Sequence, residues 1–195
     1  MKQVFIFIFA LIFLNSYGQE GLVAYFPFTN SFNDVSLTGN DLTNENTTFA
    51  SDRFGNVNSA ALFNGSTSQL IFPNEFHLGE SFTVCGWAYS RTAQFNQGTL
   101  FQSDWSREYT FYEPFSYSVY ALFHNNEQLN CNAWAGNSFV EDIDSLNWYF
   151  WTVSCDGNTL YTYVDGELRD SHPVTPNYGT GTYFPARMGR ITRNT

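Results

Sequence analysis

The sequence predicts an all-β protein, specifically an antiparallel two-sheet jelly-roll sandwich. Short aromatic and β-branched runs recur along the chain, separated by turn residues at intervals of about ten positions. No segment repeats its apolar residues with helical periodicity. The clearest evidence is a β-meander in the C-terminal third, from which the other elements are assigned.

This meander covers residues 148–171, where two Asp-Gly pairs divide aromatic runs. Asp165 and Gly166 leave two central residues, as a type I′ hairpin requires. Side chains alternate along a strand, so the first run divides into two faces. We expect the drier set to face the core: Tyr149, Trp151, Val153 and Cys155.

The other elements follow from the same pattern. Pro27 places the first strand at a sheet edge or makes it end early. Polar residues make 29–58 mostly loop, 73–79 a turn with room for one helical turn, and 140–144 an acidic loop. The further strands are predicted at 22–28, 60–63, 69–72, 82–89, 98–102, 117–124, 129–135 and 183–189.

Amino-acid composition and net charge limit the class of protein and the partners that it could bind. The 195 residues are 43% hydrophobic and 13% charged, which supports one packed core and argues against disorder. A net charge of −10 argues against nucleic acid or an anionic membrane as partner.

The N-terminus has the form of a signal peptide. Lys2 precedes the apolar run 4–14, and Gly18 supplies a small residue before cleavage at Gln19. The run is shorter than the roughly 20 residues of a membrane span. A buried first helix or an anchor is the alternative. We therefore expect residues 1–18 to be removed and 19–195 to form one secreted domain, extracellular or at the cell surface.

Several motifs resemble laminin G-like (LamGL, or LamG-3) domains. The segments that carry the resemblance, in the order of the family, are 21–28, 52–65, 82–88, 148–166 and 188–190. The resemblance implies a concanavalin A-like lectin/glucanase sandwich that binds glycans or proteins outside the cell. These domains continue into a final strand where this chain stops. We therefore expect either a fragment of a larger polypeptide or an exposed sheet edge.

The strand 82–89 also resembles pentraxins, whose matching cysteine is bridged. That resemblance implies a disulfide between Cys85 and Cys155, and two buried free thiols are the alternative. The third cysteine, Cys131, leaves an odd count. Thr67 and Ser68 stand where pentraxins carry calcium-binding Asp-Asn, so a calcium site of that type is not expected.

Catalytic residues are not evident. Glucanases of this superfamily use Glu-x-Asp-x-x-Glu, and the corresponding residues here are Asp142, Asp144 and Asn147. Asparagine cannot donate the proton that glycoside hydrolysis needs. No nucleophile motif accompanies the scattered histidines. We expect a non-catalytic protein; a secreted glycoside hydrolase of the same fold is the alternative.

The best ligand candidate is the aromatic and polar stretch after residue 103. Aromatic rings stack on sugar C–H faces while Asp and Arg bind hydroxyls. The predicted ligand-binding residues are Asp104, Trp105, Arg107, Tyr109 and Trp134. The alternative is that these aromatics fill or rim the core.

A structural calcium ion is the one cofactor considered. Asp34, Asn40 and Asp41 offer oxygen ligands in the first loop, and a solvated loop of Asx turns is the alternative. The sequence thus predicts a secreted recognition module for carbohydrate or an extracellular protein, with a structural spacer in an adhesin as a further alternative.

Overall fold

The computed structural model describes residues 21–74, 76–91, 98–102, 105–107, 117–118, 121–125, 128–133, 136–140, 146–175 and 182–189. These residues contain strands, turns and loops and no helix, which confirms the all-β prediction. It follows that no described helix is long and apolar enough to cross a membrane. The predicted signal peptide lies outside the described residues.

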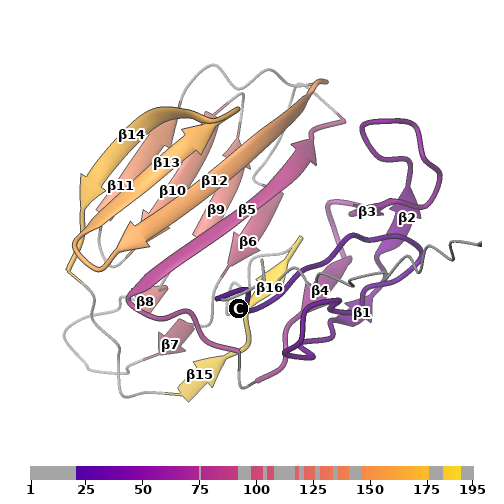
Figure 1. Cartoon of the computed structure of the whole chain (residues 1–195), viewed down its shortest axis with the longest axis horizontal. Helices are drawn as coiled ribbons and strands as arrows, with labels where there is room; N and C mark the ends of the chain where they lie inside the picture. Colours follow the sequence, from indigo (N-terminus) through magenta and orange to yellow (C-terminus); the bar gives the residue numbers. More distant parts are fainter. Residues whose placement is uncertain are drawn as a thin grey trace, which may run out of the picture.

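Two antiparallel sheets make the sandwich. The smaller has the order β14-β13-β12-β5, with β5 (Ser81–Tyr89), β12 (Trp148–Asp156), β13 (Thr159–Val164) and β14 (Glu167–Pro173). The larger has the order β1-β4-β16-β6-β9-β10-β11. Its strands are β1 (Thr43–Glu45), β4 (Gln69–Ile71), β16 (Arg187–Met188), β6 (Gly98–Gln102), β9 (Ala121–Asn125), β10 (Gln128–Ala133) and β11 (Gly136–Val140). In Figure 1 the smaller sheet lies in front of β6, β9, β10 and β11.

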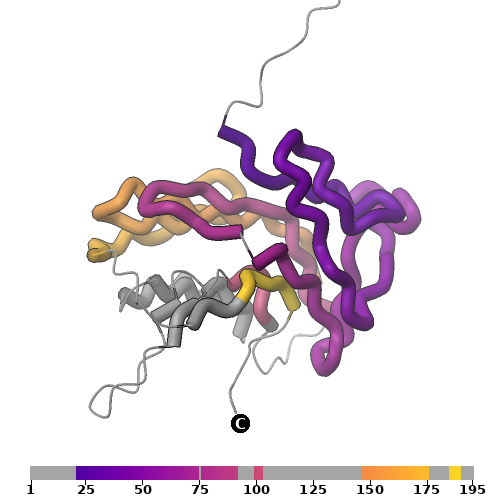
Figure 2. The backbone as a smooth tube through the Cα atoms, turned by 90° about the horizontal axis from the view of Figure 1, so that it is seen from below, coloured from indigo at the N-terminus to yellow at the C-terminus, as the bar shows by residue number. Residues whose placement is uncertain are grey.

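Two small sheets complete the described strands. One has the order β15-β7-β8, formed by β7 (Trp105–Arg107), β8 (Tyr117–Ser118) and β15 (Thr182–Phe184). The other pairs β2 (Thr48–Ala50) with β3 (Ala60–Leu62). Figure 2 shows the smaller main sheet edge-on, with the N-terminal part of the chain gathered at one end of it.

The meander forms as predicted. β12 pairs with β13 and β13 with β14, and the connecting Asp165 and Gly166 have φ values of 51° and 82°. Positive φ at both central residues is the type I′ geometry, which matches the right-handed twist of the strands. The Asp165 carboxylate also accepts the backbone N–H of Phe150 at 2.8 Å, which ties the turn to β12.

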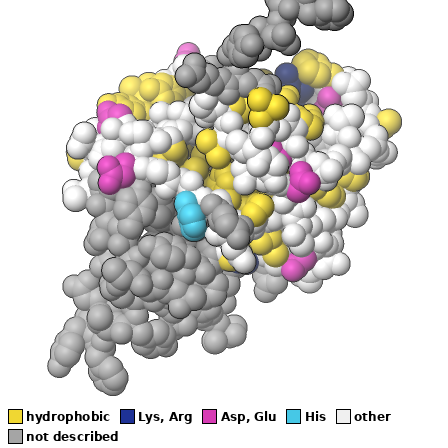
Figure 3. All heavy atoms as spheres, turned by 60° about the horizontal axis from the view of Figure 1, so that its bottom comes forward, with side chains coloured by type: hydrophobic (Ala, Val, Ile, Leu, Met, Phe, Trp, Pro, Cys, Tyr) yellow, Lys and Arg dark blue, Asp and Glu magenta, His cyan; other side chains and the backbone are white. Residues whose placement is uncertain are grey.

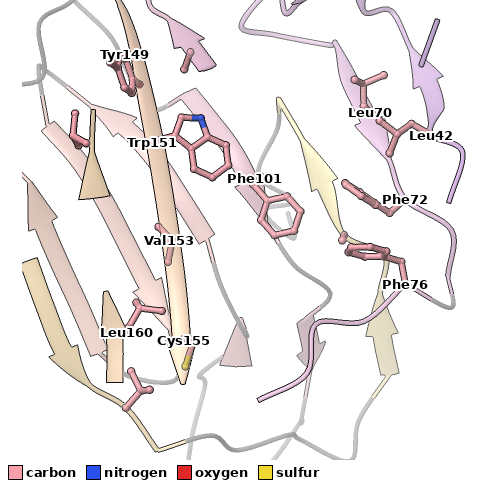
Figure 4. Close-up of a cluster of buried hydrophobic side chains, with 14 residues drawn as sticks. Leu42, Leu70, Phe72, Phe76, Phe101, Tyr149, Trp151, Val153, Cys155 and Leu160 are labelled. Atoms are coloured by element: carbon pink, nitrogen blue, oxygen red, sulfur yellow. The ribbon is translucent and has the colours of Figure 1, made fainter. Parts of the chain in front are cut away.

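The core lies between the two main sheets. The predicted inward set is confirmed, since Tyr149, Trp151, Val153 and Cys155 are all buried. Trp151 pairs with Gly86 on β5, and a Cβ at Gly86 would lie 3.2 Å from the indole ring. Figure 4 shows Trp151 between β12 and Phe101 of β6. The glycine therefore provides the room that the indole occupies.

A second aromatic group extends the core toward the N-terminal residues. Phe72 follows β4 and contacts Phe76, Phe101 and Phe26, with ring centroids 4.4, 5.7 and 5.5 Å apart respectively. Edge-to-face and tilted pairs of this kind add about 0.5–1.5 kcal/mol each beyond their area burial. Phe72 thus joins residues far apart in the sequence to one core.

Some predicted elements differ from the observed ones. Residues 22–28 form no strand, because Pro27 lacks an N–H donor and Phe28 adopts a φ of 56°, which breaks the extended backbone. The predicted helical turn in 73–79 is a single turn closed by the N–H of Phe76 and the carbonyl of Pro73. The predicted strand 117–124 is divided into β8 and β9, and β1, β2, β7 and β11 were not predicted.

Replacing Leu160 with alanine should lower the free energy of unfolding by about 2–5 kcal/mol, because the change leaves a cavity in the core. The Leu160 side chain is only 1% exposed. The control is Leu168→Ala on the neighbouring strand, where the side chain is 54% exposed, and it should change that free energy by less than about 0.5 kcal/mol. Chemical denaturation measures both, and equal losses would contradict the assigned faces of β13 and β14.

Candidate functional site

The outer surface of the smaller sheet is unusually aromatic. Burial of the alternate residues of β12 turns Trp148 and Phe150 to the outer side. On β5, Trp87 and Tyr89 also point outward, and they are 43% and 41% exposed. The solvent-facing positions of an antiparallel sheet are normally polar. This surface, defined by Trp87, Tyr89, Trp148 and Phe150, is called the aromatic face below.

Its four rings form two cross-strand pairs. Trp87 is the register partner of Phe150, and Tyr89 is the partner of Trp148. The ring centroids are 5.3 Å apart in the first pair and 5.5 Å in the second, with tilts of 46° and 43°. Along each strand the two pairs are separated by two residues, or roughly 7 Å. The result is two aromatic platforms side by side on rigid strands.

A basic side chain borders the aromatic face. The guanidinium carbon of Arg53 lies 4.3 Å from the centroid of Trp87 and 4.1 Å from that of Phe54. Both distances fall within the range of a cation–π contact. Arg53 is exposed, so its contact with the two rings leaves it in reach of solvent.

The turn that carries Arg53 is held by Asp52. Its carboxylate accepts the backbone N–H groups of Phe54 and Asn56, and the side-chain amide of Asn56, each at 2.9 Å. The Asn56 side chain makes the largest contribution to a lowered pKa of Asp52, and the backbone donors add to it. Asp52 therefore stays ionised and fixes the loop from which Arg53 reaches Trp87.

Hydroxyl groups continue the outer surface beyond the aromatic pairs. Thr83 and Ser154 lie 2.9 Å apart across β5 and β12. Tyr161 on β13 donates its phenolic hydroxyl to Asp156 at 3.2 Å. The surface therefore offers apolar rings at one end and hydrogen-bonding hydroxyls toward the other.

The predicted ligand loop is only partly placed. Asp104, Tyr109 and Trp134 lie outside the described residues. Trp105 and Arg107 are on β7, in the three-stranded sheet, at the end of the molecule opposite the C-terminal end of β5 (Figure 1). The structure does not join this strand to the aromatic face, and ligand binding by the loop stays a prediction.

Sequence reasoning missed the aromatic face, although a signal for it was available. The alternation in β12 predicts an inner and an outer set of side chains, and the prediction of a core used only the inner one. Trp148 and Phe150 are large apolar residues at positions where a solvated strand carries polar ones. A second such set, Trp87 and Tyr89, lies on β5, and the register between β5 and β12 joins the two sets into one face.

The three predicted calcium ligands do lie together in the first loop, but hydrogen bonds occupy them. Asp34 accepts hydrogen bonds from five groups, at 2.7–3.0 Å. Asp41 accepts the backbone N–H of Asp34, and Asn40 turns its amide toward the Val23 carbonyl. This arrangement does not fit a calcium cradle, because the carboxylate oxygens of Asp34 already face protein donors.

The ionisation of Asp34 reflects this network. Partial burial is the largest single influence and raises its pKa, but the backbone hydrogen bonds from Tyr25, Ser36 and Asn40 and the Ser36 hydroxyl outweigh it. The net result is a pKa well below the usual range of a carboxyl group. Within the described ranges, no group of three or more His, Cys, Asp or Glu residues could hold a metal ion.

The expected disulfide between Cys85 and Cys155 is wrong, because both thiols are free. Cys85 pairs with Thr152 and Cys155 with Phe82, so the two cysteines are offset by three positions, or about 10 Å. An odd offset also puts them on opposite faces, with Cys155 in the core and Cys85 beside Trp87. A disulfide needs Cα atoms within about 7 Å. Burial raises the pKa of both thiols.

The sequence itself settles the family. Residues 64–195 match the model of the Laminin G-like (Laminin_G_3) family in the concanavalin A-like lectin/glucanases superfamily. The chain belongs to this superfamily. The match covers more than half of the protein and confirms the resemblance inferred from the motifs. No curated protein matches the sequence.

Solved structures agree in fold. The receptor binding domain of botulinum neurotoxin D is 14% identical with a TM-score of 0.60, and the match covers 86% of this chain and 44% of that one. An endo-β-1,4-glucuronan lyase from the fungus Trichoderma reesei is 16% identical with a TM-score of 0.53, and coverage is 80% and 81%. The binding domain of Paraclostridial Mosquitocidal Protein 1 is 13% identical with a TM-score of 0.54, covering 80% and 41%. Identities this low show the fold alone. The chain spans less than half the length of the toxin structures it matches.

Replacing Asp34 with asparagine should lower the melting temperature at neutral pH, because an amide oxygen cannot accept as many hydrogen bonds as a carboxylate. The pKa of Asp34 is depressed in the folded protein. Its stabilising effect is therefore complete above the unfolded pKa of about 3.9 and is lost as the pH falls below it toward the folded pKa. The difference between the melting temperatures of the two proteins should begin to shrink below about pH 4 and vanish only as the pH approaches the folded pKa.

Melting curves recorded with and without calcium test whether the first loop binds a calcium ion. Calcium-independent melting temperatures are expected if hydrogen bonds alone hold the loop. A melting temperature of the wild-type protein that rises with added calcium, and not in the variant, would instead support a bound ion.

Proposed function

We propose that this chain is an exported, non-catalytic recognition module that binds a glycan through its aromatic face. The observation that carries the proposal is the presence of two aromatic pairs on adjacent strands of a rigid sheet, with Trp87 and Tyr89 exposed and Phe150 and Trp148 partly buried beside them. Large apolar side chains at solvent-facing positions of a sheet need a reason, and a bound partner supplies one.

The chemistry of the surface suits sugars. A pyranose ring has an apolar C–H face that packs on an aromatic ring, and hydroxyls at its rim that need hydrogen-bonding partners. Trp87 and Tyr89 offer the rings, and Thr83, Ser154 and Tyr161 offer hydroxyl groups on the same side of the sheet. Because strands fix the rings in place, little conformational entropy is lost on binding.

The structural neighbours support a binding role without specifying the ligand. Two of them are named as binding domains, one of a botulinum neurotoxin and one of a mosquitocidal protein, and the third is named as an endo-β-1,4-glucuronan lyase. By this analogy we propose that the chain is one module of a larger polypeptide and works outside the cell, where the predicted signal peptide would direct it. An extracellular protein is the competing ligand, since aromatic residues are also enriched at protein interfaces.

The enzymatic alternative rests on residues that the structure leaves out. Asp142 and Asp144 lie outside the described residues, and Asn147, which stands where glucanases of this superfamily carry the acid, cannot donate the proton. We therefore propose binding without turnover. Incubation with polysaccharides should release no reducing ends and no unsaturated products, and sustained release of either would overturn the non-catalytic part of the proposal.

Replacing Trp87 with alanine should weaken glycan binding by about tenfold or more, because it removes one platform worth about 1.4 kcal/mol or more. The fold should survive, since the side chain lies on the outer surface. Isothermal titration with glycans selected on an array measures the loss, and thermal melting confirms folding.

Trp105→Ala is the matched comparison, because Trp105 is the aromatic residue of the predicted ligand loop. Binding that survives Trp105→Ala and is lost in Trp87→Ala would place the site on the aromatic face. The reverse outcome would place the binding site in the predicted ligand loop around β7. Binding of a protein in place of glycans would show that the ligand is an extracellular protein and not a carbohydrate.

A further inference from the structure

Basic residues are scarce in this protein, yet one contacts the aromatic face and a second follows its strand β5 in the sequence. The whole chain has 8 lysine and arginine residues against 18 acidic ones. Arg53 stacks on Trp87, and Arg91 follows Tyr89 by two residues at the end of β5. Figure 3 shows few basic side chains among the coloured residues on the visible side of the molecule, where acidic ones are scattered.

Both arginines are available to a ligand. Each is exposed, and neither forms an ion pair with a carboxylate in the part of the chain that the structure describes. The neighbouring Asp52 directs its carboxylate at three donors of its own turn. Among the described residues Arg53 thus makes no close ion pair, although its charge contributes to the lowered pKa of Asp52.

The stacking of Arg53 prepares it for an anion. A guanidinium that lies over aromatic rings uses its flat faces, and its N–H groups remain free around the edge of the plane. Such a fork binds a carboxylate through two parallel hydrogen bonds. Because Phe54 and Trp87 hold the group in place, less rotamer entropy is lost when the anion binds.

The opposite border of the face is acidic. Asp165 lies beside Phe150 and accepts its backbone N–H at 2.8 Å, which places a carboxylate on the β13 side. The aromatic face thus lies between guanidinium groups at the β5 edge and a carboxylate across the sheet. A ligand with a negative group has one favourable orientation on it, with that group at β5.

We propose that the aromatic face selects acidic glycans, with sugar rings on the Trp87–Phe150 and Tyr89–Trp148 pairs and uronic acid carboxylates held by Arg53 and Arg91. This inference rests on the proposed glycan-binding function and adds the ligand's charge and its direction. Aromatic stacking alone does not distinguish acidic from neutral sugars, so the two arginines are the specificity-determining residues.

The test compares a β-linked oligomer of glucuronic acid with the neutral glucose oligomer of the same linkage and length. The acidic oligomer should bind about tenfold more tightly at low salt, and the difference should shrink as salt screens the charges. Arg53→Gln combined with Arg91→Gln should lower the affinity for the acidic oligomer to that for the neutral one. Arg169→Gln on β14 removes one positive charge elsewhere and should keep the preference.

The outcomes separate the two proposals. If neither oligomer binds, the glycan-binding function itself fails. If both bind equally to the wild-type protein, glycan binding stands and the acidic preference is wrong. Polyglutamate that competes with the acidic oligomer at equal carboxylate concentration would show that charge alone is recognised, and it would overturn the assignment of sugar rings to the aromatic pairs.

Discussion

The alternation of side chains along β5 and β12 is the constraint on which the rest of the structure depends. Trp151 can enter the core only because Gly86 faces it across the two strands. Once that pairing is fixed, the alternate residues of both strands face the outer surface of the sheet, where Phe150 contacts Trp87. A slip of one residue would exchange the two faces completely. Packing of the interior therefore determines the geometry of the outer aromatic surface.

Much of the fold could be predicted because its signals are local. Period-two alternation and an Asp-Gly pair specify a hairpin within a few residues, and Asp165 and Gly166 adopt the predicted conformation. The segment 22–28 has the composition of a strand, but pairing is a property of the whole sheet, and no neighbouring strand pairs with this segment among the described residues. The disulfide failed for a related reason, because the faces of Cys85 and Cys155 depend on the register between two distant segments.

The candidate site shows the same limit. The sequence named residues that could bind a sugar, and it favoured a polar loop since loops usually carry function. The aromatic face is instead assembled from strands about 60 residues apart, whose pairing no local pattern specifies. For Asp34, Asn40 and Asp41 the sequence predicted their proximity, but it could not show whether a metal or backbone N–H groups would face the carboxylates. Loops rich in side-chain oxygen atoms can bind a metal ion or accept hydrogen bonds from backbone N–H groups.

The contact between Arg53 and Trp87 joins two parts of the chain that are otherwise built separately. The turn closed by Asp52 belongs to the N-terminal portion, while Trp87 belongs to the central strand of the family motif. A ligand that contacts both residues would stabilise the packing of the turn against the sheet. By thermodynamic reciprocity, such a ligand would stabilise the ordered turn by the same free energy by which the ordered turn strengthens ligand binding. Recognition and the integrity of the N-terminal portion are thereby linked through a single side chain.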